Sequence, residues 1–464
     1  MSNEIEPGLD AGDAAVYHER CRPQFHFTAR RNALNAPNGL VYYQGEYHMF
    51  FQHNPMGNSW GNMTWGHAVS TDLVTWRQLD NAICPDNLGT IYSGSAVVDH
   101  TNTAGFQTGS DPVIVAMYTA AGGSSKESEG QPFTQCLAYS NDRGRTLTKY
   151  SGNPVLPHVV GENRDPKVMW YAPGGFWVMA LFLDLDSFAL FTSPNMKHWK
   201  RIQTITLPGS SECPDFFPLP VQSSPDDERW VFMAASGHYL VGRFDGTEFA
   251  VTAGAFQIDH GSNFYAGQTF SDIPAADGRR IQIAWMAGGV YPGMPFNQQM
   301  SFPCELTLRC TPSGLRLFRL PVKEIASLVE TEIEWHDLIV VPGENPLAHI
   351  QADLLDISVE ITCEQQSIFG FRIDGAEIRY SALDRTLSCL SKAFKRESED
   401  TNMTLRILAD RTSIEIFVDH GRTVLSFCVT PSDAQPTLEF FAEDAPVNVA
   451  ALEVRILRSI WQNT

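Results

Sequence analysis

Two carboxylates stand beside prolines in short polar segments that separate apolar runs of the chain. Arg164-Asp165-Pro166 is one segment, and Ser211-Glu212-Cys213-Pro214-Asp215 is the other. Two carboxyl groups about 5–5.5 Å apart are what cleavage of a glycosidic bond with retention requires. Aspartate or glutamate near proline is also ordinary turn chemistry. Each segment alone is therefore a weak signal of function.

A third segment, Asn35-Ala36-Pro37-Asn38-Gly39, precedes both of them and lies just before Leu40-Val41-Tyr42-Tyr43. Proline presets one backbone dihedral, and Asn-Gly accepts positive φ at low cost. Composition therefore predicts a turn here. This segment carries no carboxylate of its own.

Taken in order, the three segments resemble the signature of glycoside hydrolase family 32, the β-fructosidases, which include invertases, inulinases and levanases. In that family the first segment reads Asn-Asp-Pro-Asn-Gly, and Ala36 stands where the family has its nucleophilic aspartate. The stretch 414–419 is similar to the family's C-terminal sandwich, so the resemblance covers nearly the whole chain. It implies an exo-acting enzyme that releases terminal fructose from sucrose-type oligosaccharides, inulin or levan.

The resemblance also implies roles for the three catalytic positions, Ala36, Asp165 and Glu212. Glu212 matches the general acid/base, and we expect partial burial and a neighbouring carboxylate to hold it protonated. Asp165 matches the transition-state stabiliser that holds sugar hydroxyls. We expect the adjacent Arg164 to hydrogen-bond Asp165 and keep it ionised. The implied mechanism needs no metal and no other cofactor.

Other residues match the family by position. The expected substrate-binding residues are Asn35, Gln52, Trp60, Tyr92, Ser93, Arg164, Tyr265 and Trp285. Tyr92 departs from the family's Phe-Ser-Gly motif, and for Tyr265 and Trp285 core packing is an equal alternative. We expect Trp65 and His67 to be structural. Asp215 is expected to hydrogen-bond within its own turn.

Ala36 changes what the chain can do, because a methyl group cannot attack an anomeric carbon. Either an aspartate was deliberately replaced, which would leave the protein inactive or nearly so, or the protein is a natural pseudoenzyme that binds fructosides. We favour the first, since both remaining carboxylates are kept. A fructosyltransferase of the same family is a further alternative. An inverting arabinosidase propeller fits less well, because it would want wider carboxylate spacing and does not call for the Asn-x-Pro-Asn-Gly turn.

Short apolar runs broken by Gly, Pro, Asn and Asp predict an all-β protein. Ser70–Trp76 is echoed by segments starting at Ser140 and Ser193, and loosely by Phe244–Phe249. A period of roughly 40–60 residues built from hairpins is typical of a β-propeller. The four echoes plus the N-terminal hairpins predict five blades, followed by an antiparallel β-sandwich.

The predicted domains are an N-terminal arm (1–22), the propeller (23–319), a linker with a short helix (320–333) and the sandwich (334–464). Residues 322, 325, 326 and 329 form the apolar face of that helix. The remaining strand-like runs alternate in polarity, as sandwich strands do.

The net charge of −20 argues against nucleic acid and anionic membranes as partners, and no apolar run is long enough to cross a bilayer. The nine cysteines, an odd number, form no Cys-x-x-Cys pair and are set mostly among apolar residues, such as Cys84 and Cys136. We interpret them as buried reduced thiols and expect a cytoplasmic protein. A trimmed exported enzyme would look the same. The oligomeric state is left open.

Overall fold

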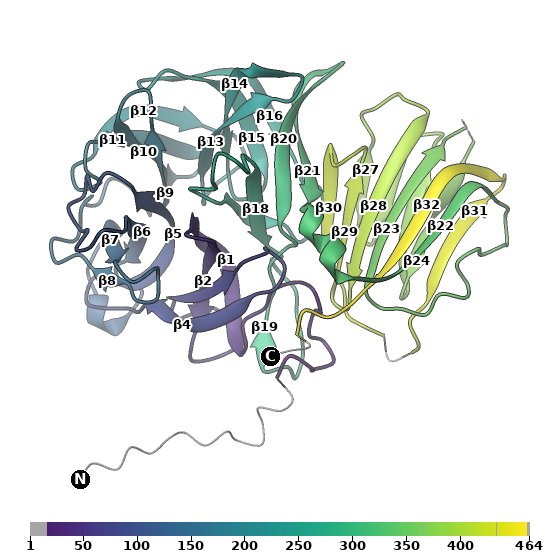
Figure 1. Ribbon diagram of the computed structural model, residues 1–464, viewed down its shortest axis with the longest axis horizontal. Helices are drawn as coiled ribbons and strands as arrows, with labels where there is room; N and C mark the ends of the chain where they lie inside the picture. The colour runs from purple at the N-terminus through teal and green to yellow at the C-terminus, as the bar shows by residue number, and fades with distance from the viewer. Residues whose placement is uncertain (1–15, 365, 433, 462–464) are drawn as a thin grey trace, which may run out of the picture.

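The computed structural model describes residues 16–364, 366–432 and 434–461, which form a propeller and a sandwich side by side (Figure 1). Each of the propeller's five blades contains four antiparallel strands, and the fourth and fifth blades are joined into one eight-stranded sheet. The prediction of a five-bladed propeller followed by a β-sandwich is confirmed. Among the described residues, no helix is long and apolar enough to span a bilayer.

The blade strands have the following bounds: β1 (Asn32–Tyr43), β2 (Glu46–Asn54), β3 (Thr64–Ser70), β4 (Arg77–Ile83); β5 (Thr90–Asp99), β6 (Val113–Ala121), β7 (Thr134–Ser140), β8 (Thr148–Lys149); β9 (Arg164–Tyr171), β10 (Phe176–Asp184), β11 (Ser187–Ser193), β12 (Lys200–Thr206); β13 (Asp215–Val221), β14 (Ser224–Met233), β15 (His238–Phe244), β16 (Phe249–Gln257); β17 (Tyr265–Thr269), β18 (Arg280–Trp285), β20 (Cys304–Thr311), β21 (Gly314–Pro321). The short β19 (Phe296–Asn297) adds to the first blade beside β1, and the 3₁₀ helix η2 (Lys126–Ser128) follows β6.

The repeated turn segments mark one place in each of the first four blades. Each connects the third strand of its blade to the fourth, for example β3 to β4 and β7 to β8. The fifth blade follows the last echo and is not the N-terminal hairpin that was expected. Its last two strands, β20 and β21, are joined by a tight hairpin at Thr311–Gly314 instead of the longer turn.

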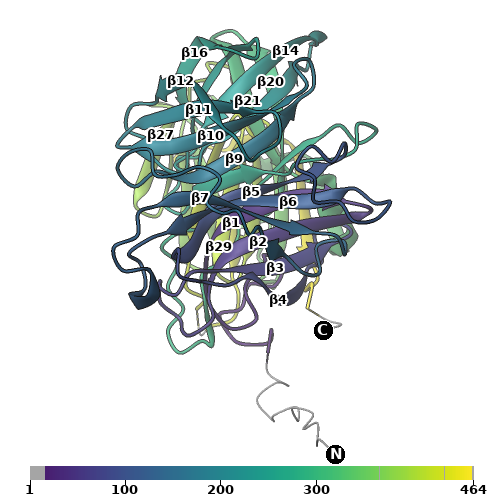
Figure 2. The same cartoon turned by 90° about the vertical axis from the view of Figure 1, so that its left-hand side faces the viewer.

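The first strands of the blades pack against one another around the propeller's centre: β1 contacts β5 and β17, and β9 contacts β5 and β13. Figure 2 views the propeller from the side away from the sandwich, with β1, β5 and β9 stacked. The N-terminal ends of these central strands therefore meet at one end of the propeller.

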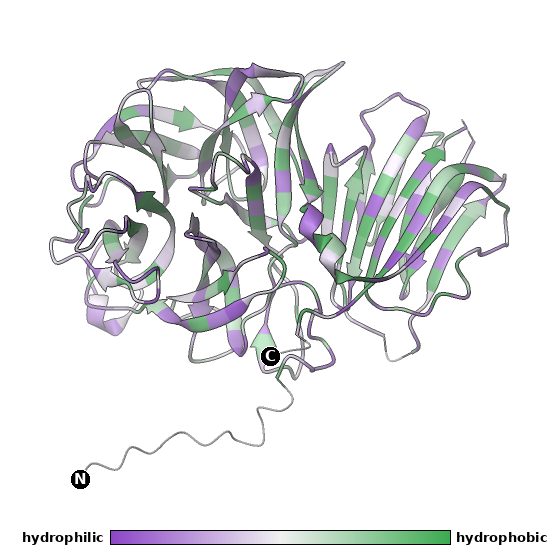
Figure 3. Ribbon diagram, viewed as in Figure 1, coloured by the Kyte–Doolittle hydropathy of each residue, from purple (hydrophilic) through white to green (hydrophobic). Residues whose placement is uncertain are grey.

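Two sheets face each other in the sandwich. One has the order β22-β32-β23-β28-β29-β30 and the other β27-β26-β25-β24-β31. Their bounds are β22 (Val329–Val340), β23 (Leu355–Thr362), β24 (Ile368–Ile373), β25 (Ala376–Ser381), β26 (Thr386–Cys389), β27 (Lys392–Lys395), β28 (Asn402–Asp410), β29 (Ser413–Val418), β30 (Thr423–Cys428), β31 (Leu438–Glu443) and β32 (Val447–Leu457). Alternate residues on the strands are apolar (Figure 3), and the inward ones form a common core.

The segment between the domains differs from the predicted linker. β21 continues to Pro321, the 3₁₀ helix η3 spans Lys323–Leu328, and β22 begins at Val329. The short helix is thus present, but the sandwich sheet starts five residues before the expected boundary.

The expected N-terminal arm is packed where it is described. Tyr17 stacks on Trp461 with ring centres 4.1 Å apart, and the Arg22 side chain is fully buried. Residues 1–15 of the predicted arm lie outside the described residues.

All nine cysteines are free thiols, and six of them are buried. Cys84 and Cys310 are exposed, so the expectation of buried thiols is wrong for these two. The cytoplasmic location stays a prediction.

Candidate active site

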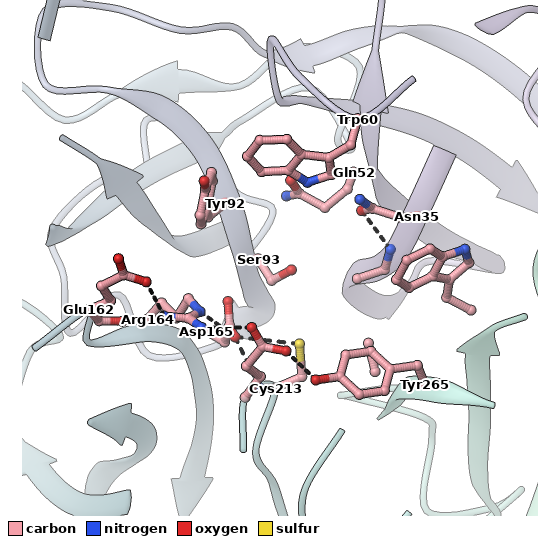
Figure 4. A pocket seen from close by; sticks show the side chains of 14 residues that line it. Asn35, Gln52, Trp60, Tyr92, Ser93, Glu162, Arg164, Asp165, Cys213 and Tyr265 are labelled. Carbon is pink, nitrogen blue, oxygen red and sulfur yellow. Dashed lines mark hydrogen bonds and ion pairs between the residues drawn. The ribbon is translucent and has the colours of Figure 1, made fainter. Parts of the chain in front are cut away.

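One cavity of about 340 Å³ lies at the N-terminal ends of the central strands, and all five blades contribute to its wall (Figure 4). The eleven residues predicted for the site all line this cavity. Its lining consists of Asn35, Ala36, Gln52, Trp60, Tyr92, Ser93, Glu162, Arg164, Asp165, Glu212, Cys213, Tyr265, Ala266 and Trp285. Segments almost 250 residues apart in sequence thus meet at one place.

The segment that carries Ala36 is part of a strand, so the predicted turn is wrong. It lies inside β1, where the pairing with β2 is interrupted by irregularities between Leu34 and Pro37 and again between Asn38 and Val41. Residues suited to turns lie here at irregularities within a strand.

Two nearby asparagine side chains bind the backbone of Ala36. Its N–H donates to Asn35 Oδ1 at 2.8 Å, and its carbonyl accepts from Asn38 Nδ2 at 3.2 Å. The methyl group is buried and packs in a small cluster with Cys213, Ala235 and Ala266. Position 36 therefore faces the segment that carries Glu212.

Arg164 contacts three carboxylates of the site. Its Nη2 donates to Glu212 Oε1 at 2.6 Å, whereas its Nε lies 3.9 Å from Asp165 Oδ2. Its Nη1 donates to the main-chain oxygen of Glu162 at 2.8 Å and lies 3.3 Å from Glu162 Oε2. The expectation that Arg164 hydrogen-bonds Asp165 is wrong, because the guanidinium points to Glu212 and Glu162.

Asp165 is buried and is held by Cys213 instead. Its Oδ2 accepts from the Cys213 N–H at 3.0 Å, with the thiol sulfur at 3.5 Å. Burial raises the pKa of Asp165 to about 6, against the opposing charge of Arg164 and with a further contribution from Glu212. The charge of Arg164 opposes the effect of burial only in part, so Asp165 is ionised above about pH 6.

Glu212 has the neighbouring carboxylate that was expected and also two donors that were not. Arg164 binds its Oε1, and the hydroxyl of Tyr265 donates to its Oε2. Burial, assisted by the Glu212 charge, raises the pKa of Tyr265, so the phenol stays a donor. Tyr265 packs edge-on against Trp285 with ring centres 6.2 Å apart. Tyr265 and Trp285 line the cavity and also pack against each other, so they are both wall residues of the site and packing residues.

Gln52 offers an unused donor to the cavity. The side chain is only 4% exposed, and its Nε2 has no hydrogen-bond partner among the described residues. A buried donor without a partner costs free energy unless a ligand satisfies it. Gln52 therefore leaves one unsatisfied donor in the wall of the cavity.

The residues that were expected to be structural, Trp65, His67 and Asp215, lie outside the cavity lining. Trp65 and His67 are buried, and Trp65 Nε1 donates to the Tyr92 carbonyl at 2.9 Å. Asp215 Oδ1 accepts a hydrogen bond from the N–H of Phe216, within its own turn as expected. Its carboxylate also reaches two other blades: Oδ2 accepts from Thr269 N at 2.6 Å, and Oδ1 lies 3.2 Å from Lys167 Nζ. It therefore joins three blades, more than its own turn.

Three lining residues were not predicted: Glu162, Cys213 and Ala266. Cys213 lies within the segment of Glu212, and Glu162 lies two residues before Arg164; that proximity is the signal that could have found them. Carboxylates grouped closely enough to hold a metal ion occur, among the described residues, at Glu332, Glu334 and Glu453 on the sandwich and not in this cavity.

Comparison with known proteins decides the family. The profile of the glycosyl hydrolases family 32 N-terminal domain matches residues 26–321, and that of the family 32 C-terminal domain matches residues 324–456. This chain belongs to glycosyl hydrolase family 32. The family is one of glycosidases, and the cavity at the centre of the propeller is the candidate glycosidase site.

Several family 32 proteins are similar over nearly the whole chain. A levanase of Bacillus subtilis (strain 168) is 38% identical, covering 98% of this chain and 73% of its own length. The extracellular exo-inulinase of Aspergillus niger is 28% identical over 96% of both chains. The crystal structure of the exo-inulinase from Aspergillus awamori superimposes with a TM-score of 0.85 at 26% identity, over 96% of this chain and all of that one.

Proposed function

We propose that the cavity binds the terminal fructosyl unit of β-fructosides such as sucrose-type oligosaccharides, inulin or levan. The relatives named levanase and exo-inulinase support this substrate class, as does a similar fructofuranosidase structure from Schwanniomyces occidentalis complexed with fructosylnystose, at 25% identity and a TM-score of 0.84. A cavity of about 340 Å³ is at the small end for ligand sites, which favours one sugar unit and exo action.

The observation that carries the proposal is the convergence of position 36, Asp165 and Glu212 on that cavity. Glu212 would exchange a proton with the glycosidic oxygen. Ionised Asp165 would accept hydrogen bonds from the sugar's hydroxyls, and Gln52 Nε2 would donate to one of them. A retaining enzyme also needs a carboxylate that attacks the anomeric carbon, and alanine supplies none. The chain therefore binds β-fructosides without hydrolysing them through a covalent intermediate.

Restoring a carboxylate tests this directly. We expect Ala36→Asp to release fructose from at least one of sucrose, inulin and levan, at a rate at least 10³-fold above the unaltered chain, since losing a nucleophile costs an enzyme that much or more. Ala36→Asn has the same size without the charge and is the matched control. If the folded Ala36→Asp protein releases fructose from none of them, the proposed function is wrong.

A natural binding or sensing protein is the second candidate, and Ala36 itself favours it. Both candidates predict fructoside binding by the unaltered chain, so binding does not separate them. The codon at position 36 in the source gene does: an aspartate codon rules out the natural binder.

A further inference from the structure

The rim of the cavity carries two strongly exposed side chains of different chemistry. Trp60 is 64% exposed, and the side chain of Glu162 is 73% exposed. In Figure 4, Tyr92 lies between them, and its ring centre is 6.0 Å from that of Trp60. An aromatic ring and an acceptor on one rim suit a polyhydroxylated ring, whose apolar face packs on the aromatic while its hydroxyls donate.

Glu162 is anchored by one oxygen only. Its Oε2 lies 3.3 Å from Arg164 Nη1, and no partner of Oε1 is found among the described residues. The anchored oxygen fixes where the carboxylate lies, and the exposed side chain leaves Oε1 accessible at the rim. Hydrogen bonds to a charged acceptor are stronger than those between neutral groups.

Arg164 does not depend on this carboxylate for its own position. The same Nη1 donates at 2.8 Å to the main-chain oxygen of Glu162, and Nη2 is held by Glu212 at 2.6 Å. Removing the charge of Glu162 therefore leaves both of these hydrogen bonds of Arg164 intact. A change at Glu162 can be separated from a change at Glu212.

We propose that Glu162 is a specificity-determining residue that binds the sugar unit next to the terminal fructose. Its carboxylate accepts hydrogen bonds from that unit's hydroxyls, with Trp60 packing on the ring. The site thereby selects fructosides whose second unit is a sugar over those with a small alkyl group. This rests on the proposed function, because the terminal fructosyl unit must occupy the cavity first.

Calorimetric titration of the unaltered chain tests the proposal, because substrate is not consumed. The two ligands are sucrose, which has a second sugar, and methyl β-D-fructofuranoside, which lacks one. We expect Glu162→Gln to weaken sucrose binding about tenfold, as loss of a hydrogen bond to a charged group does, and to leave binding of the methyl fructoside unchanged. Glu248→Gln, at an exposed position outside the cavity, is the matched control.

The outcomes separate the two claims. If Glu162→Gln weakens both ligands equally, Glu162 acts through Arg164 and the specificity role is wrong. If Glu162→Gln binds sucrose as tightly as the unaltered chain does, the specificity role of Glu162 is also wrong. If the unaltered chain binds neither ligand, the proposed function fails and this inference fails with it. A second readout is available in the Ala36→Asp background, where Glu162→Gln should raise KM for sucrose and leave hydrolysis of the methyl fructoside unchanged.

Discussion

Asp165, Glu212, Cys213 and Ala266 line the cavity with φ between +40° and +63°, a backbone region that favours glycine. Each such residue costs about 1–3 kcal/mol and persists only where the surroundings enforce it. Three of the four belong to or adjoin the two carboxylate motifs. The propeller thus stabilises a strained backbone that places both carboxylates in the wall of one cavity.

The burial of Asp165 also lowers the free energy of unfolding at neutral pH, because burial raises the pKa of this carboxyl group. An aspartate that titrates near 3.8 when unfolded and at about 6 when folded makes the folded state bind the extra proton. Stability therefore falls as pH rises from 4 to 6 and stays lowered by about 3 kcal/mol above that range.

Asp165→Asn should accordingly raise the melting temperature at pH 7.5 while abolishing fructoside binding. The gain should shrink as the pH approaches 4, because both proteins are then uncharged at this position. Thermal unfolding at pH 4.5 and 7.5, read beside calorimetric binding of sucrose, checks both parts. A variant that is less stable at pH 7.5 would show that the ionised carboxylate stabilises the fold.

At the scale of elements, β1 carries the site because of its irregular pairing. Gly39 has φ +52° within this strand, and a Cβ there would lie 2.6 Å from Phe50 Cδ2 and 3.1 Å from Trp65 Cζ3. The close approach of two aromatic rings thus fixes glycine at the end of the segment that holds Ala36.

Gly39→Ala should destabilise the protein and also weaken fructoside binding, because β1 must shift to make room. Gly45→Ala is the matched control: Gly45 also has a positive φ, +91°, but nothing lies within 4 Å of its added Cβ. We expect Gly39→Ala to cost roughly 1–3 kcal/mol more than Gly45→Ala in chemical denaturation, the usual cost of overpacking. Equal losses would contradict the packing argument.

The sequence predicted the elements better than the contacts between them. Apolar alternation located strands such as β28 and β29, and the turn motifs located blade edges. The segment at Ala36 was misread because Pro and Asn-Gly also suit a bulged strand. Arg164 was paired with Asp165 because they are neighbours in the sequence, but its guanidinium donates to Glu212 and to the main chain of Glu162. Glu162 was missed because an exposed acidic side chain in a loop is ordinary.

At the scale of the whole molecule, a buried ionic cluster joins the propeller to the sandwich. His26 precedes the first blade, and its two ring nitrogens lie 2.9 Å from Asp410 and 2.8 Å from Glu415 on the sandwich. Glu415 also lies 3.5 Å from Arg319 of the fifth blade. Apolar residues from both domains pack around this cluster, so the interface is a continuous core.

This cluster predicts a loss of stability in mild alkali. Burial alone would lower the pKa of His26, but its hydrogen bonds to Asp410 and Glu415 raise the pKa to about 9. A group whose pKa is raised on folding stabilises the protein fully at pH values below its pKa in the unfolded chain, which is 6.5 for His26. The contribution of His26 to the free energy of unfolding, about 3 kcal/mol, is therefore lost as the pH rises through 9.

Chemical denaturation of the unaltered chain and His26→Gln at pH 6.5 and pH 10 measures that loss. We expect the difference in unfolding free energy between the two proteins to be largest at pH 6.5 and to narrow by pH 10. A difference that does not change with pH would mean that His26 is neutral in the folded protein.

The sequence located both domains but not the packing between them, since His26 lies 384 residues from Asp410 and 389 from Glu415, and these residues carry no local motif. The count of five blades was right, but the sequence analysis took the N-terminal hairpins as the fifth blade. The fifth blade comes last in the chain and lacks the repeated turn. Long-range pairing of this kind is set by topology, which a single sequence does not display.

We propose that three distant segments bind one fructosyl ring and that position 36 lacks only the attacking oxygen. The crystal structure of the unaltered chain with intact sucrose tests it most directly. We expect the fructosyl unit in the cavity, with its anomeric carbon facing the methyl of Ala36 and the glycosidic oxygen within hydrogen-bond distance of Glu212. Sucrose bound with its glucosyl unit innermost, or outside this cavity, would contradict the account.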